Sequence, residues 1–294
     1  MNHTTDAVSV TEADPLELSD DELEVLASAI RISIVDMLEA AKSGHSAGPL
    51  GMADILATLY GRVLRVSRDN PAWEKRDIFI LSNGHTAPVL YAALAHTGFF
   101  PVEELLTLRQ WGSRLQGHPE RKTLPGLETT SGPLGSGLSQ GAGFAHVIEH
   151  IDAQPDRWVY VAMGDGELNE GNIWEAAMYA AKYRLSRLIG IVDRNFIQID
   201  GNTEEVMPLG DLTGKWRSFG WHVIEVNGHS IPDLLAAFRE AKRETTLPSV
   251  IIANTVPGRG VRYMENDYRW HGKVPDSAQA DLARTLLTQD GASS

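Results

Sequence analysis

Short apolar runs that alternate with amphipathic helical segments limit what this 294-residue chain can fold into. The runs IFIL (78–81) and LIGIVD (188–193) have almost no polar residues, which is typical of strands buried on both faces. The segments between such runs space their apolar residues three or four positions apart, as helices do. This alternation predicts a doubly wound, mostly parallel α/β sheet with helices on both faces. We predict strands at 78–81, 158–163 and 188–193 and in WHVIEV and PSVIIANTV, and helices at 21–43, 51–63, 87–96, 101–110, 172–183 and 231–242.

We expect a single domain, because no internal repeat or low-complexity tract divides the chain. Residues 1–20 are polar and acidic and are predicted to form a loose N-terminal arm. Ser19 or Asp20 is expected to cap the first helix, whose acidic opening suits a helix N-terminus. The domain is predicted to span residues 21–280, and residues 281–294 are predicted to form a polar tail.

The composition excludes several classes of function. The chain carries a formal net charge of −13 and has no cysteine. An acidic chain suits nucleic acid poorly, because phosphate backbones require a basic face. Without cysteine, disulfides, thiolate metal sites and cysteine nucleophiles are excluded. The acidic start does not resemble a signal peptide and no apolar run is long enough for a membrane span, so we expect a cytoplasmic protein that binds neither nucleic acid nor membrane.

The most informative polar residues follow two neighbouring predicted strands. Asp165, between Gly164 and Gly166, comes just after the strand at 158–163, and Asn195 comes after the next strand. The carboxyl ends of parallel strands meet at one edge of the sheet, where ligands bind. A carboxylate and an amide oxygen at this edge suit Mg²⁺, with Ca²⁺ as a substitute. Gly166 lets the backbone approach a diphosphate at the start of a helix, where N–H groups attract anions.

This arrangement resembles the thiamin diphosphate (ThDP) motif, in which GDG after one strand is followed by Asn after the next. Five further blocks are similar to the N-terminal region of transketolases: SGHSAGPLGMADIL, RDIFILSNGHTAPVLYAAL, GHPERKTLPGLETTSGPLGSGLSQGAGFA, DRNFIQIDGNTEEV and GRGVRYMENDYRWHGKVP. They occur in order over residues 20–275. The resemblance implies the thiamin-diphosphate-binding fold of the diphosphate-binding (PP) domain, with ThDP and Mg²⁺ as cofactors.

The resemblance also implies roles for single residues. The implied metal ligands are Asp165, Asn195 and the carbonyl of Ile197. The implied cofactor-binding residues are Gly132, Leu134, Gly164, Asp165, Gly166, Asn195 and His271. The implied catalytic residues are His45, His85, His118 and Glu170. Histidines suit a reaction that hydrogen-bonds sugar hydroxyls and moves protons near pH 7. For Glu170 and Glu175 two explanations stay open, namely favourable charge at a helix N-terminus and a function at a subunit interface.

The similarity covers only the first of the three domains of full-length transketolases. It therefore implies the N-terminal subunit of a split transketolase, paired with a C-terminal subunit that carries the pyrimidine-binding and C-terminal domains, in an α2β2 assembly. The implied activity is transfer of a two-carbon ketol unit from a ketose to an aldose, with sugars or sugar phosphates as substrates.

Three alternatives stay open at this point. The α subunit of a 2-oxoacid dehydrogenase, or another ThDP lyase, shares the GDG-to-Asn motif and the split architecture. A specialised ketol transferase of a sugar or natural-product route fits as well as an enzyme of central metabolism. A ThDP-binding protein without activity is the non-enzyme alternative, and the retained histidines argue against it.

Overall fold

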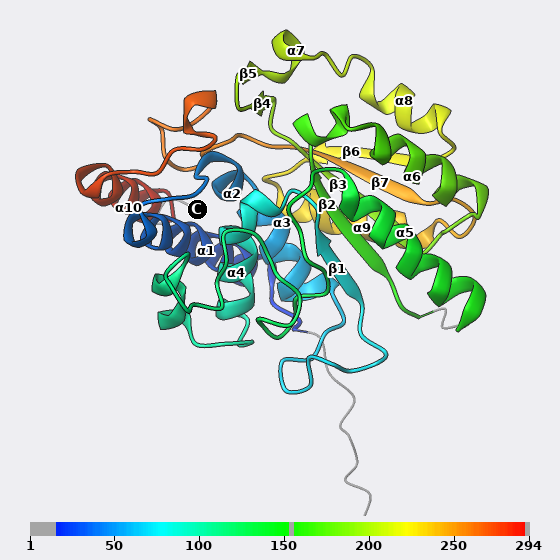
Figure 1. Ribbon diagram of the computed structural model, residues 1–294, viewed down its shortest axis with the longest axis horizontal. Helices are drawn as coiled ribbons and strands as arrows, with labels where there is room; N and C mark the ends of the chain where they lie inside the picture. The colour runs from blue at the N-terminus through cyan, green and yellow to red at the C-terminus, as the bar shows by residue number, and fades with distance from the viewer. Residues whose placement is uncertain (1–15, 153–155, 292–294) are drawn as a thin grey trace, which may run out of the picture.

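A five-stranded parallel sheet forms the centre of the molecule (Figure 1). The structure is a computed structural model that describes residues 16–152 and 156–291. Its strands lie in the order β1-β2-β3-β7-β6, and all neighbouring pairs run parallel, which confirms the predicted fold class. The strands are β1 (Ile78–Leu81), β2 (Val159–Gly164), β3 (Leu188–Arg194), β6 (His222–Asn227) and β7 (Ser249–Asn254).

Helices cover both faces of the sheet, because successive strand residues point to opposite sides. Phe79 and Leu81 enter one core, and Ile78 and Ile80 enter the other. The first core is covered by α1 (Asp20–Ala41), α2 (Ala47–Gly51), α3 (Ala53–Thr58), α4 (Ala87–His96), α9 (Ile231–Arg243) and α10 (Ser277–Gly291). The second is covered by α5 (Ser136–His146), α6 (Gly171–Lys182) and α8 (Leu212–Ser218). Within the described ranges, no helix is long and apolar enough to cross a membrane.

The winding direction reverses after β6, and this reversal puts helices on both faces. β1, β2 and β3 are neighbours in chain order, whereas β6 takes the outer edge and β7 returns between β3 and β6. Because crossovers between parallel strands are right-handed, a reversed step carries its helix to the opposite face. The helix that joins β6 to β7, α9, therefore packs with α1 and α3, while α5 and α6 pack together on the other face.

The N-terminal arm predicted at 1–20 is ordered at its described end. Residues 1–15 lie outside the described residues. Leu18 packs against the core, and its N–H donates a hydrogen bond to the carbonyl of Gly61 (3.1 Å). Ser19 caps α1 through a capping box with Glu22, which confirms one of the two predicted caps.

The segment predicted as a polar tail at 281–294 is helical in its described part, because α10 continues to Gly291. This helix packs beside α1 (Figure 1). It buries a stripe of Ala280, Ala283 and Leu287 at helical spacing. The guanidinium of Arg284 also pairs with Asp36 of α1 at 2.7 Å. The stripe is hard to recognise in the sequence, because it consists mainly of small alanines among polar residues. Residues 292–294 lie outside the described part of the chain.

Two predicted helices are built differently in the structure. The helix predicted at 51–63 is divided into α2, α3 and a π turn at Leu59–Val63. The division falls where Gly51 passes so close to Val256 that a Cβ would lie 3.0 Å from its carbonyl oxygen. The segment 101–110 forms a 3₁₀ turn at Val102–Thr107, and Arg109 then adopts a left-handed φ of 58°. Further single turns lie at Gly84–Thr86, Val147–Ile151, Gly166–Asn169 and Tyr268–Trp270.

Candidate active site

A cavity of about 330 Å³ lies at the carboxyl edge of the sheet, beside the ends of β1, β2 and β3. Most of its walls come from the segments after these strands, since parallel strands direct such segments to one edge. All the predicted metal and cofactor residues line it, together with three of the predicted catalytic residues. These lining residues are His45, His85, His118, Gly132, Leu134, Gly164, Asp165, Gly166, Asn195, Ile197 and His271.

Glu170 is the one predicted site residue that does not line the cavity. It precedes α6 as an exposed N-cap residue. A Cβ built on Gly135 would lie 2.9 Å from the Cβ of Glu170, so this residue adjoins the loop that carries Gly132 and Leu134. Both explanations of Glu170, favourable charge at a helix N-terminus and a function at a subunit interface, are compatible with this position. Its role stays a prediction.

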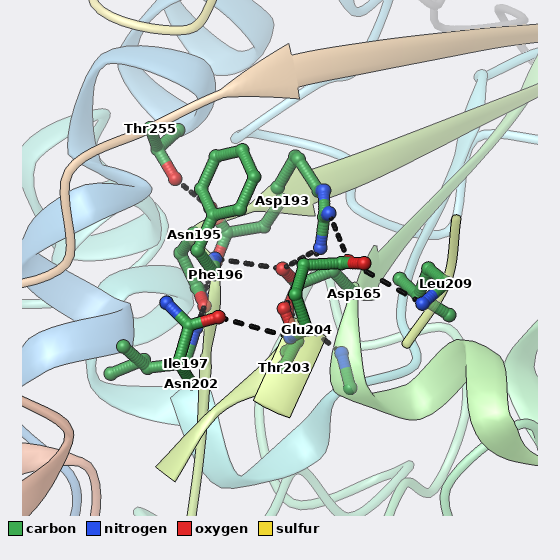
Figure 2. A network of polar contacts seen from close by, with 12 residues as sticks. Asp165, Asp193, Asn195, Phe196, Ile197, Asn202, Thr203, Glu204, Leu209 and Thr255 are labelled. Atoms are coloured by element: carbon green, nitrogen blue, oxygen red, sulfur yellow. Dashed lines mark hydrogen bonds and ion pairs between the residues drawn. The ribbon is translucent and has the colours of Figure 1, made fainter. Parts of the chain in front are cut away.

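Asp165 is buried at the end of β2 and is held by three donors (Figure 2). Its Oδ1 accepts the N–H of Gly166 (2.8 Å), and its Oδ2 accepts the N–H of Phe196 (2.7 Å) and one guanidinium nitrogen of Arg194 (2.9 Å). Burial raises the pKa of Asp165 to about 6, although Arg194 acts in the opposite direction. A divalent cation beside this carboxylate would further favour its ionised form.

Asn195 is held in one orientation by its neighbours. Its Nδ2 donates to Asp193 (2.7 Å), and its Oδ1 accepts the N–H of Ile197 (3.0 Å). Asp193 is itself fixed by the hydroxyl of Thr255 (2.5 Å), and burial raises the pKa of Asp193 to about 7. The amide oxygen of Asn195 therefore points away from Asp193, toward the segment that supplies the carbonyl of Ile197.

Arg194 links this network to the segment beyond the cavity. Its guanidinium also pairs with Glu204 (2.5 Å), in the short α7 (Thr203–Val206), and lies over the ring of Phe196 at 4.0 Å. Phe196 has a φ of 63°, a left-handed conformation that is strained for a bulky residue. Between Phe196 and α7 the chain forms the hairpin of β4 (Ile197–Gln198) and β5 (Gly201–Asn202).

Three of the predicted histidines form a close cluster in the cavity wall. The ring centroids of His45 and His85 are 4.9 Å apart, those of His85 and His271 are 5.1 Å apart, and those of His45 and His271 are 5.3 Å apart. Burial, together with the neighbouring histidines, lowers the pKa of His45 to about 4 and that of His85 to about 3. Burial also lowers the pKa of His271 and His118. At neutral pH these side chains are uncharged and can donate and accept hydrogen bonds.

We expect neither His45 nor His85 to titrate near the usual histidine pKa of about 6.5. Burial favours the neutral imidazoles, so their Cε1–Hε1 NMR signals should stay at neutral-form shifts down to about pH 5. His45→Ala and His85→Ala would assign the two signals. Because the unfolded chain takes up these protons first, the two histidines should lower the stability progressively as the pH falls from about 6.5 toward their folded pKa values. A midpoint near 6.5 for either signal would contradict the buried cluster.

The residues present fit a polar, anionic ligand with a metal ion. Buried polar atoms normally have hydrogen-bond partners. Among the described residues, however, His45 Nδ1, Asn83 Oδ1, Gln198 Nε2 and His271 Nδ1 are buried without one, and all four residues line the cavity. The described part of the chain contains no group of three or more His, Cys, Asp or Glu side chains that could hold a metal. A metal at Asp165 would thus depend on the Asn195 amide, the Ile197 carbonyl and oxygen atoms of the ligand.

Glycines leave room in the cavity and allow close approach around it. A Cβ on Gly132 would have no heavy atom within 4 Å, so this position leaves open space in the wall. Gly135, with a φ of 81°, passes so close to Asn172 that a Cβ would lie 2.0 Å from its Oδ1. The close contact at Gly135 therefore fixes the path by which the loop with Gly132 and Leu134 enters the cavity wall.

Sequence reasoning missed several residues of the site. Asn83, Glu167 and Gln198 line the cavity, and Asp193 and Arg194 hold its proposed metal ligands. A signal for Asp193 was present, because an acidic residue at the end of a buried apolar strand requires a partner. Glu167, directly after GDG, carried the same kind of signal.

Comparisons with known proteins agree with this fold. Residues 23–293 match the family described as transketolase, thiamine diphosphate binding domain. The chain is 39% identical to 6-deoxy-6-sulfo-D-fructose transketolase subunit SqwG of Clostridium sp. (strain MSTE9), covering 92% of this chain and 98% of that protein. It is 41% identical to an apulose-4-phosphate transketolase subunit of Phocaeicola vulgatus, covering 89% of this chain and 92% of that protein. A crystal structure of a transketolase variant from Pichia stipitis is 35% identical with a TM-score of 0.86, covering 92% of this chain and 41% of that one.

The fold and the family match define a thiamin diphosphate-binding domain of the α/β class. Within that class, the chain belongs to the transketolase family. It spans less than half of human transketolase, to which it is 37% identical over 91% of this chain and 42% of that protein.

Proposed function

We propose that this chain is the N-terminal subunit of a two-chain transketolase, which transfers a two-carbon ketol unit from a ketose to an aldose. The observation that carries the proposal is the single cavity that combines Asp165, Asn195 and the histidine cluster within a chain of the transketolase family. The family match favours this activity over that of a 2-oxoacid dehydrogenase α subunit.

The proposed cofactors are ThDP and Mg²⁺. Asp165, Asn195 and the carbonyl of Ile197 would hold the metal, and the backbone at Gly166, which has no side chain, would lie beside the diphosphate. Gly132 and Leu134 would contact the pyrimidine ring, and His271 would donate to the diphosphate. ThDP supplies the carbon nucleophile that ketol transfer requires.

The histidines of this chain would act on the sugar. His45, His85 and His118 line the cavity, and burial holds their pKa values below the usual range, so each can accept or donate a hydrogen bond at neutral pH. Such groups can orient the hydroxyls of the ketose and move a proton at its hydroxyl oxygen. Their position around one cavity would also exclude water from the reacting carbon.

A partner subunit with the pyrimidine-binding and C-terminal domains would complete the enzyme, in an α2β2 assembly. In support, the chain covers 92–99% of three relatives that are named as transketolase subunits. The apolar side chain of Ile199, which lines the cavity, is also 72% exposed. Exposed apolar residues near a site are typical of an interaction surface.

The proposed substrate class rests on the same relatives. Their names specify a sulfonated ketose, 6-deoxy-6-sulfo-D-fructose, and a sugar phosphate, apulose 4-phosphate. We propose a specialised ketose with an anionic terminal group as the donor. Xylulose 5-phosphate, the donor of central metabolism, is the comparison substrate.

The test is a ketol-transfer assay with ThDP and Mg²⁺, first with this chain alone and then with the product of the adjacent reading frame. Donors would be xylulose 5-phosphate, 6-deoxy-6-sulfo-D-fructose and apulose 4-phosphate, with an aldose phosphate as acceptor. We expect no turnover with the single chain and turnover with the mixture. Robust turnover by the purified single chain would overturn the two-chain assignment, and 2-oxoacid decarboxylation without ketol transfer would overturn the reaction.

A further inference from the structure

Glu167 is a buried carboxylate that is not among the proposed metal, cofactor or sugar ligands. It lies in the 3₁₀ turn Gly166–Asn169, is 2% exposed and lines the cavity. Its Oε1 accepts the N–H of Gly135 (2.6 Å) and the hydroxyl of Ser82, and its Oε2 accepts the N–H of Gly164 (3.1 Å). The Glu167 carboxylate thus accepts hydrogen bonds from three donors.

The three donors belong to three different walls of the cavity. Ser82 directly follows β1 and precedes Asn83 and His85, Gly135 follows Gly132 and Leu134, and Gly164 ends β2 just before Asp165. Ser82 adds a fourth link, because its hydroxyl oxygen accepts the N–H of Gly137 (3.0 Å). Glu167 therefore joins segments that are up to 85 residues apart in the sequence.

Close packing around these links leaves little room for adjustment. A Cβ on Gly137 would lie 2.4 Å from the Cβ of Ser82. The backbone of the loop at 132–137 is thus held against the end of β1 by contact, and against Glu167 by hydrogen bonds. Hydrogen bonds from backbone N–H groups to a carboxylate are about twice as strong as neutral ones, and they strengthen further in a buried site.

We propose that Glu167 is a positioning residue for ThDP, which sets the pyrimidine-binding loop at Gly132–Leu134 in register with the diphosphate-binding turn at Gly164–Gly166. This inference rests on the proposed binding of ThDP in this cavity. A cofactor that spans both segments requires a fixed distance between them, and only Glu167 bonds directly to both Gly135 and Gly164 among the hydrogen bonds described.

The test is Glu167→Gln in the full chain, measured by calorimetric titration with ThDP at saturating Mg²⁺. Glutamine keeps the shape, but its NH₂ group must face one of the backbone N–H donors, so one link is lost. Loss of supporting interactions of this kind typically weakens metal affinity about 10–100-fold, and we expect the Kd for ThDP to rise by a similar factor.

Glu149→Gln is the matched control. Glu149 accepts two backbone N–H bonds, from Ser186 (3.2 Å) and Arg187 (2.9 Å), and the hydroxyl of Ser186 (3.1 Å), but it does not line the cavity. Both variants should lower Tm, and only Glu167→Gln should raise the Kd for ThDP. Equal Kd values for the two variants would overturn the positioning role.

Ser82→Ala covers the case in which Glu167→Gln does not fold. It removes the hydroxyl link and leaves both backbone N–H bonds to Glu167, so we expect a rise in Kd that is smaller but in the same direction. If Glu167→Gln does not fold and Ser82→Ala leaves the Kd for ThDP unchanged, the inference is overturned. If the wild-type complex with the partner subunit itself fails to bind ThDP, the proposed function fails first, and this result differs from binding that is unaffected by the substitutions.

Discussion

Replacing Asp165 by alanine is expected to abolish Mg²⁺-dependent ThDP binding. Asp165 supplies the one charged oxygen among the proposed metal ligands, and its carboxylate also holds the N–H groups of Gly166 and Phe196. Loss of groups that only support a metal ligand costs about 10–100-fold in metal affinity, so loss of the ligand itself should cost at least about 100-fold. Calorimetric titration of the full chain with ThDP, with and without Mg²⁺, measures this change.

Stability must be separated from cofactor affinity in this experiment. Asp165→Ala removes one of two carboxylate partners of the buried Arg194, and breaking a buried pair costs about 3–5 kcal/mol of stability. Asp54→Ala is the matched control, since Asp54 pairs with the buried Arg31 and does not line the cavity. Both variants should lower Tm, while only Asp165→Ala should lose ThDP. An unchanged Kd for ThDP in Asp165→Ala would remove this residue from the metal site.

Replacing His85 by alanine is expected to lower kcat/KM for ketol transfer by about 10²–10⁴-fold in the complete enzyme. Its ring lies 4.9 Å from that of His45 and 5.1 Å from that of His271, and it lines the cavity without belonging to the proposed metal ligands, so it can hydrogen-bond the sugar. The Kd for ThDP should change only slightly, because the metal ligands and the diphosphate turn stay in place. Steady-state kinetics with saturating ThDP, together with a ThDP titration, separates the two effects.

His96→Ala provides the comparison for His85→Ala. His96 ends the helix that His85 precedes, and it hydrogen-bonds Ser33 (2.8 Å) outside the cavity. We expect wild-type kcat/KM for His96→Ala. Wild-type turnover in His85→Ala would demote that histidine to a structural role, and a parallel loss of ThDP binding would place it on the cofactor instead.

The sheet was predictable because its strands are buried on both faces. A run such as LIGIVD, with almost no polar residues, is compatible with few other environments, and the alternation with helices then determines the parallel arrangement. The division at Gly51 was not predictable, since it depends on contact with Val256, some 200 positions later. The packing of the helix after Ser277 against the core was not predicted, because its buried stripe is made largely of alanine, which has no strong hydrophobic signal.

Part of the lining of the candidate site was predictable from its motifs, whereas the groups that hold these residues in place were not. Asp165 and Asn195 follow adjacent strands, so their proximity results from the topology. Glu167 is bonded to Gly135 through the packing of a distant loop, and no sequence spacing encodes that contact. The contact between Arg194 and Asp165 was equally unpredictable, because the sequence does not show whether the Arg194 side chain points into the protein or into solvent.

The ion pair between Arg194 and Asp165 has a consequence for the order in which ligands enter. A divalent cation that approaches Asp165 meets a carboxylate whose charge is already partly neutralised by the guanidinium at 2.9 Å. A free cation therefore gains little attraction there, whereas a cation that arrives with a diphosphate brings its own anionic oxygens. We expect the metal and the diphosphate to be taken up as one preassembled complex, so that occupancy by either depends on the concentration of both.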